Sequence, residues 1–370
     1  MRKIYTITFH SSYNYGSNLQ AYALQEYVKK LDNDCDYKII NLRKDIQKDM
    51  YKTCFERDGL KNKVKSLLLF NEKKNFGLKQ ERFEKFIQEY LNITKEYNNS
   101  SDFGKDLEDG KYFISGSDQV WNVRARDFDW ANYLEFVKDG KRIAYSASFG
   151  PKAHTWDTEE KERLMEDIKK YDYISVREQG SYNNVEELTG IKSEINVDPT
   201  MLLKKEDWMK IIGSKPIVEG KYILLYNLNP DKEYNEIAKK VSQILNMPVV
   251  ITRMNNFKEL AYGFKTRFDT GPLEFLNLIN NASLVLSSSF HGTVFSIVFN
   301  KPFFAINGAK DFRISTLLTK MGLENRTIEI DNIEEKASQS FDIDFSGAEK
   351  NIQEERNKSE KYLKNALDIE

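Results

Sequence analysis

The residues with the clearest potential for chemistry surround His291, one of three histidines in the chain. The apolar residues 284–286 predict a buried strand, and residues 294–299, apolar nearly throughout, predict a buried helix. His291 would then lie in a strand-to-helix turn at the carboxyl end of a parallel strand, where open α/β sheets bind ligands. A helix start offers backbone N–H groups and a positive dipole end, so the pattern favours an anion site. Gly292 has no Cβ and would let the anion approach the backbone, although a histidine at a helix start can also be only a cap.

Two further polar segments follow predicted strands in the first half of the chain. Ser117 and Asp118 come soon after the buried strand 112–114, in a turn that suits a ligand or an Asx-type turn equally well. Arg177 follows the strand 173–176, where its guanidinium could reach an anion or form a salt bridge with a nearby carboxylate. Both segments are candidates for the polar edge of a parallel sheet.

The N-terminal segment predicts a third polar loop at such an edge. Residues 4–9 alternate apolar and polar side chains and lead through His10 into a loop that ends at Gly16. Ser17 and Gln20 have the spacing of a capping box, which predicts a helix start at Ser17. With the strand that follows, this makes a β-loop-α-β unit whose parallel connection should be right-handed. The loop lacks the GxGxxG pattern of dinucleotide sites and could face any polar ligand.

The composition limits the classes of protein to which the chain can belong. At 370 residues it exceeds the ~250–300 at which single cores stop growing, so we expect two domains. Its 56 basic and 57 acidic residues nearly cancel, which gives no support to a nucleic-acid or anionic-membrane surface but still permits local basic pockets. Cys35 and Cys54 have neither zinc nor CxxC spacing, and no cluster of metal ligands is visible. We find neither a signal peptide nor the roughly 18 apolar residues of a membrane span, and we expect a cytoplasmic protein.

Glycine and proline residues cluster near 205–220 and mark the expected domain boundary. We predict a first α/β domain over residues 1–212, with a charged helical insertion at about 43–110. A second series of strands and helices fills residues 213–345. Residues 346–370 predict a final helix that packs back on the first domain.

Six motifs, taken together, resemble the polysaccharide pyruvyl transferase family over roughly residues 5–323. They are NYGSNLQAYAL (14–24), ISGSDQVWN (114–122), RIAYSASFG (142–150), ISVREQGS (174–181), VDPTMLL (197–203) and SSSFHGTVFSIVFNKPF (287–303). Each is weak alone, but their order and spacing together are specific. The resemblance implies an α/β fold with two Rossmann-like domains facing each other across a cleft, the GT-B-type arrangement.

The resemblance also implies a reaction. A pyruvyl (carboxyvinyl) group would pass from phosphoenolpyruvate to a sugar of a cell-surface polysaccharide or exopolysaccharide, or of its lipid-linked precursor, and form a ketal. Phosphoenolpyruvate would be a co-substrate, with no cofactor and no metal required. The implied partners are phosphoenolpyruvate and a saccharide or lipid-linked saccharide, without nucleic acid and with at most peripheral membrane contact; a homo-oligomer is left open.

Site residues can be carried over from the family motifs. His291 matches the family's histidine in an Arg-Leu-His-Gly-like run, but Ser289 stands in the place of the arginine and Phe290 in that of the leucine. We expect His291 to act as general acid or to contact the leaving phosphate, since histidines titrate near neutral pH. Arg177 matches the arginine of a first-domain motif and Arg313 a basic position after the last strand, and both could grip an oxyanion.

Further residues complete the expected site. Asp118 is a candidate base or acceptor of a sugar hydroxyl, with His10 as a weaker second base, and His154 is expected at the surface. The helix start is expected to add Ser289, Gly292 and Thr293 to the donor site; the acceptor or cleft loops would include His10, Asn14, Gly16 and Ser117.

Two other functions fit the same sequence. Loss of the family arginine at Ser289 would either abolish donor binding or move it to another cation. A GT-B-type fold also suits a glycosyltransferase that uses a nucleotide sugar, and the missing arginine permits a non-catalytic carbohydrate-binding member of the family.

Overall fold

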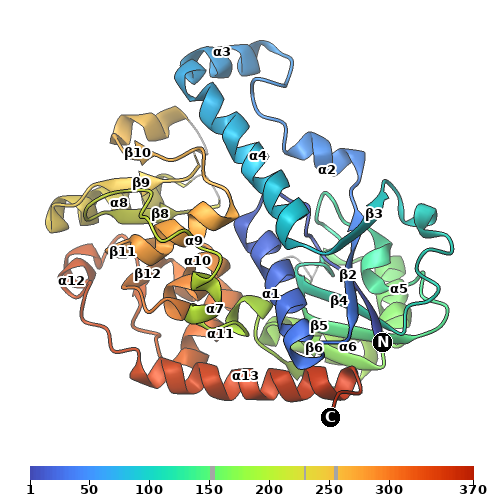
Figure 1. Cartoon of the computed structure of the whole chain (residues 1–370). Coiled ribbons are helices and arrows are strands. Elements are labelled where there is room, and N and C mark those ends of the chain that lie inside the picture. The colour runs from blue at the N-terminus through green and yellow to red at the C-terminus, as the bar shows by residue number, and fades with distance from the viewer. Residues whose placement is uncertain (151–154, 229–230, 254–256) are drawn as a thin grey trace. The chain divides into compact units, whose positions relative to one another are not determined.

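Two parallel sheets organise the chain in the computed structural model, which describes residues 1–150, 155–228, 231–253 and 257–370 (Figure 1). The strand order is β3-β2-β1-β4-β5-β6-β7 in the first sheet and β10-β9-β8-β11-β12-β13 in the second. All recorded strand pairings are parallel. Each sheet with its helices is a Rossmann-like α/β unit, as the sequence predicts.

The strand order of the first sheet reverses between β1 and β4, so that the chain builds outward from these two central strands. The strands are β1 (Lys3–Ile7), β2 (Asp36–Leu42), β3 (Ile93–Tyr97), β4 (Tyr112–Asp118), β5 (Lys141–Ala147), β6 (Tyr173–Val176) and β7 (Glu194–Ile195). Helix α1 (Tyr15–Leu31) links β1 to β2, whereas α5 (Thr158–Ile168) links β5 to β6 in the opposite direction. Because such crossovers are right-handed, α1 and α5 cover opposite faces of the sheet (Figure 1).

The first sheet is stabilised by a core rich in aromatic rings. Every residue of β4 is buried, as expected for a central parallel strand covered on both faces. Trp121, just beyond β4, is fully buried and stacks on Tyr133, with ring centroids 5.5 Å apart, and against Phe149 at 5.2 Å. This core fixes the segment that leaves the carboxyl end of β4.

The second sheet reverses between β8 and β11 in the same manner. Its strands are β8 (Ile223–Tyr226), β9 (Val249–Ile251), β10 (Lys265–Thr266), β11 (Leu284–Ser287), β12 (Phe303–Ile306) and β13 (Thr327–Ile328). Its helices are α7 (Lys205–Met209), α8 (Lys232–Leu245), α9 (Pro272–Asn281), α10 (Phe290–Val298), α11 (Phe312–Met321) and α12 (Ile333–Ser338). Helix α10 is buried along its whole length, which explains its nearly continuous apolar sequence.

The chain divides into two units, and neither is continuous in sequence. The first contains Met1–Thr53, Lys85–Leu203 and Glu354–Glu370, and the second contains Cys54–Glu84 and Lys204–Gln353. This division differs from the contiguous domains expected from the sequence, because residues 54–84 pack with the second sheet. The remaining helices before the last one are α2 (Asp45–Met50), α3 (Leu60–Leu68), α4 (Lys73–Tyr90) and α6 (Gln179–Thr189).

The last helix, α13 (Ser346–Ala366), packs back on the first unit through its carboxyl-terminal half. The Tyr362 hydroxyl donates to the carbonyl of Ala144 in β5 at 2.8 Å, and Ser359 Oγ accepts from the amide of Val197 at 3.1 Å. This confirms the expected packing of the final helix. Across the described residues, no helix combines the length and apolar character that a bilayer span requires.

Candidate functional site

The carboxyl ends of β1 and β4 form the reversal point of the first sheet, and predicted site residues follow both strands. Open α/β sheets bind ligands where the strand order reverses. The loop after β1 carries Asn14 and Gly16, and β4 ends in Ser117 and Asp118. The structure therefore brings these four residues to one edge, although they lie about a hundred positions apart in sequence.

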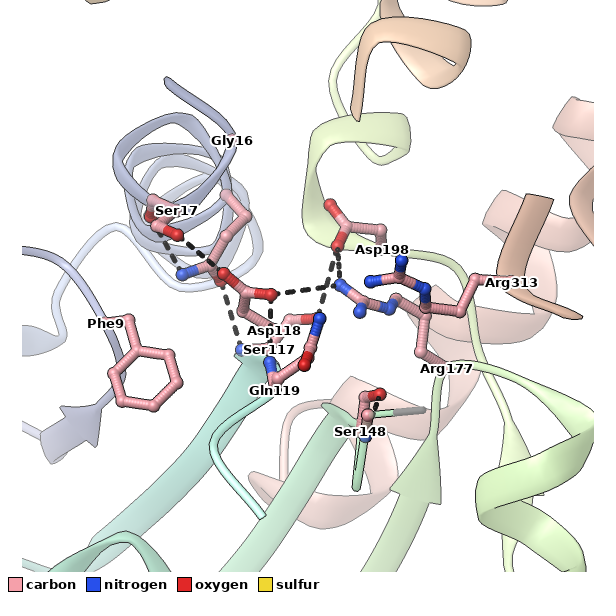
Figure 2. Close-up of polar contacts among 12 residues, drawn as sticks. Phe9, Gly16, Ser17, Ser117, Asp118, Gln119, Ser148, Arg177, Asp198 and Arg313 are labelled. Atoms are coloured by element: carbon pink, nitrogen blue, oxygen red, sulfur yellow. Dashed lines mark hydrogen bonds and ion pairs between the residues drawn. The ribbon is translucent and has the colours of Figure 1, made fainter. Parts of the chain in front are cut away.

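The orientation of the Asp118 side chain is fixed by its backbone conformation and by two hydrogen bonds (Figure 2). Its φ of 70° lies in the left-handed region, which an aspartate adopts at some cost and which is frequent at functional sites. Ser17 Oγ donates to Asp118 Oδ2 at 2.6 Å, and the amide of Gln119 donates to Oδ1 at 2.9 Å. The side chain keeps 12% of its surface exposed. Asp118 is thus an oriented carboxylate that a ligand can still reach.

Arg177 lies just beyond β6, and three carboxylates surround its guanidinium. Two of them, Asp118 and Asp198, are labelled in Figure 2. Its side chain is 2% exposed, with Nη1 at 3.2 Å from Asp198 Oδ2 and 3.5 Å from Asp118 Oδ1. Nε lies 3.3 Å from Glu178 Oε2. Burial disfavours the charge, but Glu178, Asp118 and Asp198 outweigh it, so the pKa of Arg177 is raised.

The carboxylates in this cluster outnumber its one cation by three to one. With all three ionised, Arg177 and its neighbours would carry a net charge of −2, counting one positive and three negative groups. Such a surrounding disfavours a second anion and favours hydroxyl donors. The placement makes Arg177 a counter-ion of the carboxylates, whereas the sequence suggests a grip on the donor phosphate.

The loop and helix after β1 contact the turn at the end of β4. The α1 helix begins at Tyr15 with Asn14 as its N-cap, whose side chain accepts from the Gly16 amide at 3.0 Å. The predicted capping box at Ser17 and Gln20 is therefore wrong. Gln20 instead bonds the amide of Ser117 at 3.1 Å through Oε1, so that both side chains fasten α1 to the β4 turn.

His10 and Ser117 are both buried and hydrogen-bonded within the first unit. Ser117 is buried and donates from Oγ to the carbonyl of Ser146 at 2.7 Å. The His10 ring is 1% exposed, with Nδ1 at 3.2 Å from the Thr8 carbonyl and Nε2 at 3.0 Å from the Asn41 side-chain oxygen. Burial lowers the pKa of His10. These contacts favour a structural role for His10 over that of a second base.

In the second unit, His291 lies where the sequence predicts, in the first turn of α10 directly after β11. The reversal point of this sheet is the pair β8 and β11, so His291 also starts a helix at a switch point. His291 is 7% exposed, and its ring contacts the ring of Phe290 edge to face, with the ring centroids 5.4 Å apart. Ser289 is the N-cap residue and is 2% exposed.

Gly292 has a packing role in the structure. A Cβ at this position would lie 2.2 Å from Ser287 Oγ and 2.9 Å from Tyr226 Cδ1. The absent side chain therefore lets α10 pack closely on β11 and β8. Thr293 is also committed to the fold, because its hydroxyl donates to the carbonyl of Ser289 at 3.1 Å.

Arg313, near the start of α11, pairs with the residue that caps the same helix. Its Nε and Nη2 contact the two carboxylate oxygens of Asp311 at 3.1 and 2.6 Å. Burial of Asp311 opposes ionisation, but Arg313 outweighs it and lowers the pKa of Asp311. Two of the five N–H donors of Arg313 are used in this fork, and within the described part of the chain the other three can donate to an oxyanion.

Sequence reasoning missed three acidic residues at the first site. Asp198, in the short turn after β7, accepts at Oδ1 from the Thr200 amide at 3.0 Å, and Glu178 follows Arg177 directly. Asp127 lies in the segment after β4, where burial and the charge of Asp118 raise its pKa. Of these three, only Asp198 is marked by a sequence pattern, an aspartate before proline at the end of a strand. His154, expected at the surface, lies outside the described residues.

The acidic residues do not form a metal centre by their arrangement. Asp118, Glu178 and Asp198 converge on a guanidinium. In the ranges described by the structure, no group of three or more His, Cys, Asp or Glu side chains is placed to hold a metal ion.

Comparison with known proteins agrees with this fold. The UDP-N-acetylglucosamine 2-epimerase from Rickettsia bellii is 11% identical, with a TM-score of 0.54 over 100% of this chain and 97% of that chain. A putative UDP-N-acetylglucosamine 2-epimerase from Listeria monocytogenes is 10% identical, with a TM-score of 0.57 and coverages of 99% and 96%. The UDP-GlcNAc 2-epimerase from Neisseria meningitidis bound to UDP-GlcNAc is 11% identical, with a TM-score of 0.57 and coverages of 98% and 99%. No curated protein matches the sequence.

The two Rossmann-like units and their similarity to these epimerases define an α/β protein of the GT-B type. At such low identity the likeness concerns the fold alone, since one fold hosts many reactions. Residues 14–309 match the family described as polysaccharide pyruvyl transferase. The chain belongs to the polysaccharide pyruvyl transferase family.

Proposed function

We propose that this protein transfers a pyruvyl group from phosphoenolpyruvate to two hydroxyls of a saccharide or lipid-linked saccharide in the cytoplasm, forming a ketal. The observation that carries the proposal is Asp118, a partly exposed carboxylate fixed by Ser17 at 2.6 Å and placed at the reversal point of the first sheet in a member of this family. A fixed carboxylate is suited to accept a proton from an attacking sugar hydroxyl.

The charges of the two units support different tasks. The first unit holds one guanidinium among three carboxylates, so it suits neutral hydroxyl donors better than the anionic phosphoenolpyruvate. The second unit offers the first turn of α10, whose amides point to the amino end of the helix, and the remaining donors of Arg313. We therefore assign the acceptor to Asp118 and the donor phosphate to α10 and Arg313.

The reaction balances with two hydroxyls. One sugar oxygen bonds to C2 of phosphoenolpyruvate while an acid, which we assign to His291, gives a proton to C3. The second sugar oxygen then bonds to C2 as the C2–O bond to phosphate breaks. Of the two hydroxyl protons, one replaces the proton donated to C3 and the other leaves with phosphate, so no oxidant or cofactor is needed.

A first test is Asp118→Asn, which keeps the shape of the side chain but removes its basicity. We expect the rate of phosphate release with acceptor present to fall by about 10²–10⁴-fold, the usual contribution of a positioned base. Asp157→Asn is the matched control, because Asp157 is an exposed aspartate that caps α5 in the same unit. Full activity of Asp118→Asn would remove this residue from the reaction.

A second test asks which donor binds. Phosphoenolpyruvate at ~100 times its dissociation constant should add about 2.7 kcal/mol to the free energy of unfolding. We expect this shift in the wild type and its loss in Arg313→Met, whereas uridine and cytidine nucleotides should give none. A shift only with a nucleotide would favour a glycosyltransferase, and turnover without any dependence on phosphoenolpyruvate would refute the proposal.

A further inference from the structure

Helix α3 (Leu60–Leu68) exposes apolar side chains to an unusual degree. Twelve large apolar residues are exposed among those that the structure describes, and five of them lie between positions 60 and 70. These are Leu60 (79% exposed), Val64 (50%), Leu67 (77%), Leu68 (59%) and Phe70 (68%). Scattered exposed apolar residues are normal, but a contiguous group marks a surface that is covered in function.

The spacing places these side chains on one face of the helix. Leu60, Val64, Leu67 and Leu68 follow the i, i+4, i+7, i+8 pattern of an apolar stripe. In a globular protein such a stripe normally faces the core. In α3 no residue is buried, and the stripe faces outward.

The opposite, polar face of α3 is the one attached to the protein. Ser66 Oγ donates to the carbonyl of Cys54 at 2.9 Å, whereas the bond from Asn62 to the carbonyl of Asp58 at 2.7 Å is local to the start of the helix. Leu69, one residue beyond the helix, is buried and anchors its end. The Ser66 contact and the burial of Leu69 are on the side opposite the apolar stripe, which is left exposed.

The segment that carries α3 is fixed to the second unit. Phe55 packs on Phe76 of α4 with centroids 6.1 Å apart, and Phe76 stacks on Phe268 at 5.3 Å. Further along α4, Arg82 Nη1 contacts Asp269 Oδ2 at 2.8 Å. Figure 1 shows that α3 is followed by the long helix α4. The apolar stripe of α3 is therefore joined to a helix that packs against the second unit.

The charges around the stripe are positive. Residues 59–71 contain Lys61, Lys63 and Lys65 and no acidic residue. At 3.6 residues per turn, Lys61 and Lys63 border the stripe on its two sides, where their long stems can lie along apolar surroundings and their amines can reach outward. An apolar stripe between lysines is the pattern of a helix that lies in the interface of an anionic membrane.

We propose that α3 docks this protein on the surface of a bilayer that contains anionic lipids. Leu60, Val64, Leu67, Leu68 and Phe70 enter the boundary between headgroups and acyl chains, and the exposed Lys61 and Lys63 contact lipid phosphates. The inference rests on the exposure and charge of α3 and is independent of the proposed reaction.

Sedimentation with vesicles tests the docking. The full-length wild type should pellet with vesicles of equal parts phosphatidylcholine and phosphatidylglycerol, remain in the supernatant with phosphatidylcholine alone, and be released by high salt. Leu67→Ser/Leu68→Ser should weaken partitioning by roughly tenfold or more, because two exposed leucines no longer enter the bilayer. Lys61→Glu/Lys63→Glu should remove the dependence on phosphatidylglycerol.

Matched variants elsewhere provide the controls. Ile244→Ser/Phe341→Ser changes two exposed apolar residues away from α3, and Lys105→Glu/Lys111→Glu changes two exposed lysines. Both should pellet like the wild type, and circular dichroism should show that all four variants fold. The proposal is overturned if the wild type does not pellet, if the α3 variants pellet like the controls, or if Leu67→Ser/Leu68→Ser converts a dimer into a monomer, which would identify a second copy as the partner.

Discussion

Replacing Arg177 by methionine should destabilise the first unit strongly. The guanidinium is 2% exposed and lies within 3.5 Å of carboxylate oxygens from Asp118, Glu178 and Asp198. Methionine fills similar space but leaves the buried carboxylates without their counter-ion. Breaking a buried pair in this way costs about 3–5 kcal/mol, and three carboxylates around one cation place the expectation at the upper end, about 5 kcal/mol.

Thermal and urea unfolding of Arg177→Met would measure this loss. A domain of 150–250 residues loses about 2–4 °C of Tm per kcal/mol, so the transition of the first unit should move down by roughly 10–20 °C. Arg177→Met/Asp198→Asn should recover part of the stability.

The control for this experiment is Lys138→Met. Lys138 is 87% exposed and lies 4.0 Å from Glu108, a surface contact worth about 1 kcal/mol or less. If Arg177→Met were no less stable than Lys138→Met, or if Asp198→Asn gave no recovery, the carboxylate cluster would not depend on the guanidinium. The argument that its charge is unsuited to a second anion would then fail.

Two further predictions concern the second unit. Gly292→Ala should lower the free energy of unfolding by about 1–3 kcal/mol in urea, because its Cβ would lie 2.2 Å from Ser287 Oγ. The control is Gly180→Ala, at a helical position with open space around it, which should be neutral or stabilising. Equal effects of the two substitutions would contradict the packing role of Gly292. Burial and the charge of Arg253 lower the pKa of Lys79 to about 7, so folding favours the neutral amine. The wild type should therefore gain stability relative to Lys79→Met as pH rises from about 7 towards 10, where the unfolded lysine loses its proton, and a gap independent of pH would contradict this.

The elements that carry the site could be predicted because their signals are local. The run around His291 has an apolar strand, a polar turn and a buried helix in order, and the structure places β11 and α10 there. The polar end of the strand that leads to Asp118 is predictable for the same reason. Local periodicity and turn residues sufficed for these elements.

The partners of the site residues could not be predicted, because they come from distant parts of the chain. Ser17 and Gln20 have the spacing of a capping box, but their side chains bond Asp118 and Ser117, about a hundred residues away. Arg177 meets Asp118 only once β4 and β6 take their places in the sheet. The spacing of residues along the sequence does not indicate contacts between such distant positions.

Residues 54–84, part of the charged insertion expected at about 43–110, pack with the second unit for a related reason. Their charges suggest a solvated insertion in the first domain, yet Arg82 pairs with Asp269 at 2.8 Å and Phe76 stacks on Phe268 at 5.3 Å. Each partner lies nearly two hundred residues further along the chain. The apolar residues of α3, in contrast, are exposed although their spacing is that of a core-facing helix.

The discontinuity of the two units has a consequence for synthesis on the ribosome. All seven strands of the first sheet have been made once residue 203 is joined, but the helix that supplies Ser359 and Tyr362 to this unit is made only after the second sheet. Residues 54–84, conversely, are made well before the sheet on which they pack. Both units of a nascent chain therefore stay incomplete until α13 has been made, and gene fragments cut between the two sheets would encode neither unit in full.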